Sequence, residues 1–181
     1  MKKALLNFCL VFGSLAAFAG SQAQAGLWVQ SAISVSQLKQ DFGAPDGASQ
    51  SLSETRFLNS TTLGVSLLEG LLVGGQFLAS NNTRTHDRTF AYGPKGGILL
   101  KGFEVTGAYL PFAEDVRGTD QRTGGGFSLS SGYTFGIAGP FRAGFHATYW
   151  YIRFDRLNGA ELAVKQRVSQ IAPQLSVALL F

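Results

Sequence analysis

Beyond its first 25 residues, the sequence has no cysteine, few charged residues and no long apolar run. Cys9 is the only cysteine, so the rest of the chain has no disulfide and no thiolate metal ligand. No stretch of about 18 apolar residues follows residue 25, which excludes a membrane-spanning helix there on length. Charged residues make up 14% of the chain, well below the roughly 25% of ordinary soluble domains.

Glycine and aromatic residues are present in excess. The chain has 23 glycines, and aromatics make up 12% of it, a content that argues against a disordered chain. The net charge is +4, and Lys2 and Lys3 contribute two of these charges. The remainder is too weakly basic to indicate a nucleic-acid partner, and we expect none. The two histidines are far apart in the sequence, so we expect no metal site and no cofactor.

Residues 1–25 have the pattern of a secretory signal peptide. Lys2 and Lys3 form a basic start, residues 4–19 are mostly apolar, and Ala23 and Ala25 place small residues at a cleavage site. We therefore expect export, cleavage after Ala25, and a single mature domain over residues 26–181.

Eight segments after residue 25 have strand character and are about as long as a tilted strand that crosses a bilayer. They are Leu27–Lys39, Thr55–Leu68, Leu71–Ser80, Thr89–Leu100, Phe103–Phe112, Gly125–Phe135, Phe141–Phe154 and Arg167–Phe181. Short connections carrying Gly or Pro alternate with longer polar ones at residues 40–54, 81–88, 113–124 and 155–166. Short turns on one rim and long loops on the other are the layout of outer-membrane barrels.

Side-chain parity separates an apolar face from a small, polar face in these segments. In the last segment Ile171, Leu175 and Phe181 share the apolar face, whereas Gln170 and Ser176 lie on the other. The charged residues Arg56, Lys95, Glu104 and Arg142, inside the segments, all fall on the polar face, away from lipid. These features predict an all-β fold, an eight-stranded antiparallel up-and-down transmembrane β-barrel. The alternative is a soluble barrel of the lipocalin type, which the small residues of the minority face disfavour.

The seventh segment departs from this pattern. Trp150, Ile152 and Phe154 put apolar groups on the polar parity, and a β-bulge there would switch the faces.

The signal peptide, eight strands, alternating connections and terminal Phe181 together resemble the small outer-membrane barrels of the OmpA and OmpX kind. The resemblance covers residues 26–181 and implies an outer-membrane location in a Gram-negative-type envelope, and we expect a monomer. It also implies that the last strand is the signal read by the barrel-assembly machinery, which falls here on Leu175, Val177, Leu179 and Phe181.

Five titratable residues fall on the inward parity and form a predicted polar network in the lumen. They are Arg56, Lys95, Glu104, Arg142 and His146. Because an eight-stranded barrel is just wide enough to be filled by side chains, we interpret them as a network of paired charges that plugs the lumen. The alternative is a selectivity ring in a narrow pore.

The longer connections and their flanks are rich in cations. Arg84, Arg88, Arg153, Arg156, Lys165 and Arg167 are candidate contacts for the phosphates of lipopolysaccharide. The alternative is that these are solvated charges offset by nearby acids.

We expect a non-enzymatic protein with an envelope-structural or surface-interaction role through its loops. The first alternative is an acyltransferase or deacylase that modifies lipid A. His86, Asp87 and Ser80 are the residue types that barrel palmitoyltransferases use on the loop side. His146 and Thr148 half resemble the His-x-Ser pair of small barrels that deacylate lipid A.

Overall fold

In a computed structural model, described over residues 26–43, 49–67, 70–82 and 85–181, the chain forms one closed barrel of eight antiparallel strands. The strands are β1 (Gly26–Gly43), β2 (Ser49–Leu67), β3 (Leu71–Asn81), β4 (Arg88–Leu100), β5 (Phe103–Arg117), β6 (Asp120–Ala138), β7 (Phe141–Leu157) and β8 (Ala160–Leu180). Each pairs with its neighbour in sequence, and β1 closes the ring on β8. The predicted fold class is confirmed, while the predicted signal peptide at residues 1–25 lies outside the described residues. Among the described residues, no helix is long and apolar enough to cross a membrane.

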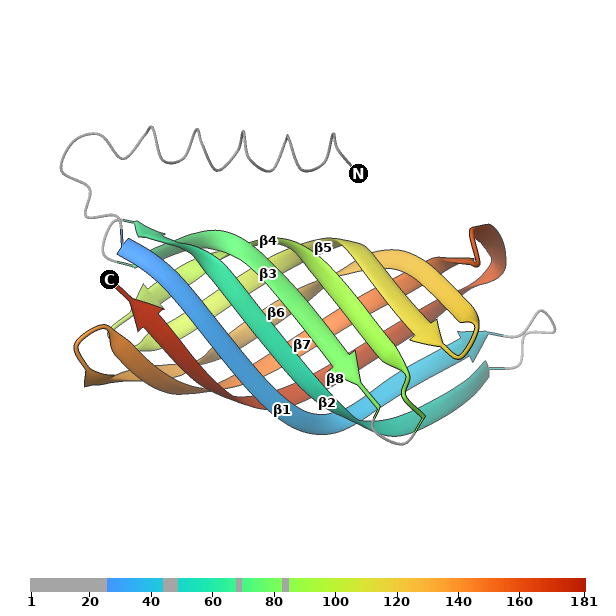
Figure 1. Cartoon of the computed structure of the whole chain (residues 1–181), viewed down its shortest axis with the longest axis horizontal. Coiled ribbons are helices and arrows are strands. Elements are labelled where there is room, and N and C mark those ends of the chain that lie inside the picture. Colours follow the sequence, from blue (N-terminus) through green and yellow to red (C-terminus); the bar gives the residue numbers. More distant parts are fainter. Residues whose placement is uncertain (1–25, 44–48, 68–69, 83–84) are drawn as a thin grey trace.

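The two ends of the barrel differ (Figure 1). At one end lie the start of β1, the C-terminus and tight turns such as Lys101–Gly102 and Gly139–Pro140. We call this the turn end. The hairpins that join β3 to β4, β5 to β6 and β7 to β8 lie at the opposite end, which we call the hairpin end.

The predicted long loops are for the most part strand, so that expectation was wrong at three of the four connections. β5 and β6 run on to a two-residue turn at Gly118–Thr119, and β7 and β8 to one at Asn158–Gly159. Asn158 and Gly159 have φ of 49° and 84°, the left-handed conformation that a type I′ hairpin needs and that Asn-Gly favours. β1 and β2 also continue to the pair Gly43 and Ser49. Polar composition marks these segments as solvated, and it does not prevent them from pairing.

The faces follow the predicted parity. At the C-terminal end of β8 and just after it, Ile171, Leu175, Val177 and Phe181 are 69%, 55%, 57% and 65% exposed, whereas the alternate residues Ala172, Gln174, Ser176 and Ala178 are buried. The outward wall is therefore a continuous band of exposed aliphatic and aromatic side chains, and Arg56, Lys95 and Glu104 point inward. A wall of this kind is stable only against an apolar medium.

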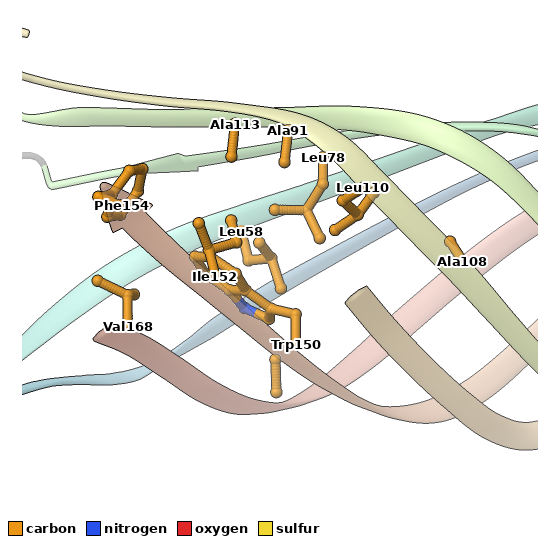
Figure 2. Packing of buried hydrophobic residues seen from close by; sticks show 11 residues of the cluster. Leu58, Leu78, Ala91, Ala108, Leu110, Ala113, Trp150, Ile152, Phe154 and Val168 are labelled. Carbon is orange, nitrogen blue, oxygen red and sulfur yellow. The ribbon is translucent and has the colours of Figure 1, made fainter. Parts of the chain in front are cut away.

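The interior is less polar than the sequence indicates, because one layer of it is apolar. Trp150, Ile152 and Phe154 stay on the inward side and are fully buried, so no bulge switches the faces before them. They pack with Leu58, Leu78 and Leu110 and smaller neighbours from other strands in one cluster (Figure 2). The register shift of β7 against β8 comes only after Phe154.

The seam between β1 and β8 has a gap in its ladder. Pairing runs from Trp28 to Ile33 and resumes at Leu38 in the same register, so residues 34–37 face residues 171–174 without backbone pairs. Pro173 lies inside this stretch, and proline has no N–H to donate. Side chains bridge the gap instead, since the amide of Gln170 donates to the hydroxyl of Ser36.

Candidate functional site

The charged side chains of the lumen form two separate clusters. The first lies toward the turn end and contains Glu104, His146 and Lys95 with their polar neighbours. Glu104 is the second residue of β5 and is 3% exposed. Its Oε2 accepts a hydrogen bond from Gln30 Nε2 at 3.1 Å and lies 3.3 Å from His146 Nε2. β1 and β5 lie four strands apart in a ring of eight, so the contact from Gln30 to Glu104 spans the lumen.

Lys95 completes this turn-end cluster. Its Nζ donates to the hydroxyl of Thr62 at 3.1 Å and lies 5.1 Å from the centre of the Trp28 ring. Trp28 is 2% exposed, so the indole and the ammonium together fill the lumen near the turn end. A buried cation over an indole face is a favourable arrangement.

His146 lies between a hydroxyl and a carboxylate, in the order of a hydrolase triad. Its Nδ1 is 3.0 Å from Ser176 Oγ, and its Nε2 faces Glu104. All three side chains are at most 6% exposed and face the filled lumen, so a substrate has no approach to the serine. The arrangement links β5, β7 and β8 by polar contacts inside the barrel. No group of three or more potential metal ligands occurs among the described residues.

The second cluster lies at the hairpin end around Arg56, whose side chain is fully buried. Its guanidinium lies 3.0 Å from Glu54 Oε2, 3.7 Å from Asp115 Oδ1 and 4.0 Å from Asp87 Oδ2. It also donates from Nη1 to Thr89 Oγ1 at 2.9 Å. A planar, permanently charged guanidinium suits several acidic partners at once.

Two further arginines balance the acids of this hairpin-end cluster. Arg117 Nε donates to Asp115 Oδ2 at 2.7 Å, and Arg122 Nη1 lies 3.6 Å from the same oxygen. Burial and the neighbouring Arg117 lower the pKa of the Arg122 guanidinium, and Asp115 opposes that change. Three cations, Arg56 included, thus face three acids, and loss of any one leaves an uncompensated charge in a confined space.

The predicted polar network is therefore divided. Lys95, Glu104 and His146 lie together, whereas Arg56 belongs to the other cluster and Arg142 is half-buried near the start of β7, with no ion pair in the described part of the chain. The sequence prediction missed Glu54, Asp115, Arg117 and Arg122, because they fall in segments assigned to loops, and it considered Asp87 only as a loop residue. Asp115 and Arg117 lie two residues apart on one face at the end of β5, and this spacing was the signal in the sequence that could have predicted an ion pair there.

Polar and apolar contacts fill the lumen between the clusters. Gln76 Nε2 donates to Ser60 Oγ and its Oε1 accepts from Ser128 Oγ, both at 2.7 Å, which joins β2, β3 and β6. Beside them stands the apolar cluster of Trp150 and its neighbours. Contacts across the barrel, such as that from Gln30 to Glu104, fit a lumen filled by side chains better than a pore.

The residue types that suggested lipid A chemistry do not converge. His86 is exposed on the β3–β4 connection, whereas Ser80 is fully buried and Asp87 faces Arg56. A general base without a nearby nucleophile or orienting acid supports no catalytic assignment here.

Most of the predicted lipopolysaccharide contacts lie exposed toward the hairpin end. Arg88, Arg153, Arg156, Lys165 and Arg167 are exposed and make no ion pair with another described residue, while Arg84 lies outside the described residues. These side chains are accessible to an anion outside the barrel.

A closed, eight-stranded antiparallel barrel with an apolar outer wall and a filled polar interior is the fold of the small outer-membrane barrels. Among solved structures the chain is similar to Neisserial surface protein A (NspA), with a TM-score of 0.53 and 13% identity over 89% of this chain and 100% of that one. At that identity the likeness shows the fold alone. It is more remotely similar to Ail, the attachment invasion locus protein of Yersinia pestis, solved with the heparin analogue sucrose octasulfate (TM-score 0.42, 12% identity, coverage 86% and 99%). No family model and no curated protein matches the chain.

Proposed function

We propose that this protein is a non-enzymatic barrel of the bacterial outer membrane, exported through its N-terminal segment, with its hairpin end outward. Its role is to stabilise the envelope or to make contacts at the cell surface. The observation that carries the proposal is the exposed apolar wall around a lumen filled by paired charges. Such a molecule gains stability from lipid outside and has neither a channel nor an accessible catalytic group inside.

We also propose that the cationic residues of the hairpin end contact lipopolysaccharide. Arg88, Arg153, Arg156 and Arg167 are exposed and make no ion pair with another described residue. Guanidinium groups bind phosphates through paired, charge-assisted hydrogen bonds. With the hairpin end outward, we expect these side chains to reach the phosphates of lipid A in the outer leaflet.

The orientation has a direct test. An epitope inserted between Asn158 and Gly159 should be accessible to antibody on intact cells, because this hairpin lies at the hairpin end. The same epitope between Lys101 and Gly102, at the turn end, should become accessible only after the outer membrane is permeabilised. The proposal fails if both tags are inaccessible on intact cells, or if the protein fractionates as a soluble species.

Phe181 is proposed as the end of the signal that the assembly machinery reads, with Leu175, Val177 and Leu179. Deletion of Phe181 is expected to reduce insertion in cells far more than shortening the β1–β2 connection at residues 44–48. Phe181 is 65% exposed, and its backbone N–H donates to Leu27 O at 3.1 Å. Its removal therefore costs the folded barrel little packing.

That small structural cost makes the control informative. The Phe181 deletion variant, refolded in vitro into vesicles, should unfold in urea close to the wild-type midpoint. Equal insertion of the two variants in cells would count against a signal role. An equally large loss of stability in vitro would assign the effect to the fold.

A further inference from the structure

A groove of about 650 Å³ lies on the outer wall where β5, β6 and β7 approach the hairpin end. Its residues are drawn from Tyr109 and Pro111 on β5, 123–127 on β6, and Tyr151 with 153, 155 and 156 on β7. It opens to the outside of the barrel, because Tyr109, Phe127 and Arg153 are exposed on that face. This volume is in the range of a small-ligand site.

Three consecutive glycines leave the floor of the groove without side chains. A Cβ on Gly124 or Gly126 would lie 1.9 Å from the backbone oxygen of Arg153 or Tyr151, so the chains approach closely there. Gly125 has the outward parity and lies directly opposite Arg153 on β7. Any larger residue at Gly125 would fill the space beside that arginine.

The upper edge of the groove has an excess of unpaired positive charge. Arg153 is also paired in register with Arg167 on β8, which places two arginines opposite each other on the outer face. Like charges at directly opposed positions of a sheet are destabilising. On its other side in the register Arg153 lies opposite Gly125, which has no side chain to offset its charge. Arg156 adds a further exposed cation to the lining, whose only acid is Asp155, and Glu161 on β8 lies opposite Arg156 in register, outside the lining.

The lower edge is aromatic. The rings of Phe127 and Tyr151 lie 5.6 Å apart, and Tyr109 completes this side. Aromatic side chains gather where a barrel wall leaves the hydrocarbon for the headgroup region. An arginine-rich edge above an aromatic edge matches a molecule with phosphate on a sugar and acyl chains below it.

We propose that this groove binds a phosphorylated sugar headgroup, that of lipid A, from the side. Arg153 and Arg156 hold the phosphate, and the aromatic edge lies against the sugar and the first methylenes of the acyl chains. The inference rests on the proposed outer-membrane location and adds to it one defined site on the rim. Because the groove opens laterally, its ligand arrives within the membrane plane and not through the lumen.

The test is native mass spectrometry of the folded barrel in detergent, with bisphosphorylated lipid A, monophosphorylated lipid A and phosphatidylglycerol as separate probes. The double variant Arg153→Gln/Arg156→Gln should bind bisphosphorylated lipid A about 100-fold more weakly, since each lost charge-assisted contact accounts for roughly tenfold. The matched control is Arg88→Gln/Lys165→Gln, which removes two exposed rim cations outside the groove lining. It should weaken binding by about threefold at most, because the rim contacts proposed for these two residues lie outside the groove and hold the headgroup less tightly than Arg153 and Arg156 do. Retained heat-modifiable mobility on gels verifies that each variant is folded.

Each outcome has one meaning. Equal weakening by the groove and control variants would overturn the groove and leave a diffuse rim interaction, so the proposed contact with lipopolysaccharide would stand. If phosphatidylglycerol binds as tightly as lipid A and the groove variant loses this binding too, the groove recognises phosphate alone, and the proposed recognition of a sugar headgroup is wrong. Wild-type protein that binds none of the probes would overturn the groove, and the epitope experiment would still decide the outer-membrane location.

Discussion

Arg56→Met is expected to lower the free energy of unfolding by about 3 to 5 kcal/mol, the usual cost of leaving a buried charge without its partner. The side chain of Arg56 is fully buried and lies within 4.0 Å of Glu54, Asp87 and Asp115. Without it, three acids share two arginines. The measurement is urea unfolding from lipid vesicles, followed by the mobility difference between folded and unfolded barrels.

A second substitution separates charge balance from lost packing. Glu54→Gln in the Arg56→Met background restores equal numbers of cations and acids, so the double variant should be more stable than the sum of the single effects predicts, by about 0.5 to 3 kcal/mol. Arg88→Met, at an exposed arginine with no ion pair among the described residues, should stay within about 0.5 kcal/mol of wild type. Strict additivity of the two cluster substitutions would contradict the charge-balance account.

Trp150→Ala is expected to cost about 3 to 5 kcal/mol, because it removes a large, fully buried ring from the apolar cluster. The ring packs in one cluster with residues of other strands, including Leu58 and Leu78, which cannot collapse into the space without bending the wall. The loss should appear as a lower urea midpoint with an unchanged fold.

Trp150→Phe keeps most of the packing and removes one hydrogen bond. Trp150 Nε1 donates to Gln170 Oε1 at 3.0 Å, so this variant should lose only about 1 to 3 kcal/mol, the cost of an unsatisfied buried acceptor. A Trp150→Ala barrel as stable as wild type would show that the apolar cluster contributes little. Equal losses in both variants would assign the whole effect to the hydrogen bond.

Parity along the strands made most of the fold predictable. A period of two has a strict geometric meaning, so Ile171, Leu175 and Phe181 could be placed outward from the sequence alone, and the structure agrees. The ends of the strands were not predictable in the same way. Asn158 and Gly159 were assigned to a loop because polar composition outweighed the hairpin signal that this dipeptide carries.

The sequence predicted which charged residues point into the lumen, and it did not predict which of them lie together. Glu104, Lys95 and Arg56 were placed inside by parity, but parity says nothing about depth along a tilted barrel. Depth is set by strand tilt and register, which follow from the closure of the ring. For the same reason Arg56 was grouped with Glu104, although its partners come from the hairpin end. The groove depends on bulges near Pro111 and after Thr123, which the sequence does not specify.

The gap at Pro173 gives this barrel a preferred line of opening. Seven of its strand boundaries are held by a covalent connection between neighbours, and the eighth, between β1 and β8, is held by pairing alone and lacks it over residues 34–37. The amides of that stretch therefore lose protection first when the barrel loosens. The β1–β8 boundary is therefore the line along which we expect the strands to separate first, and Pro173 lies in the stretch where the pairing is already missing.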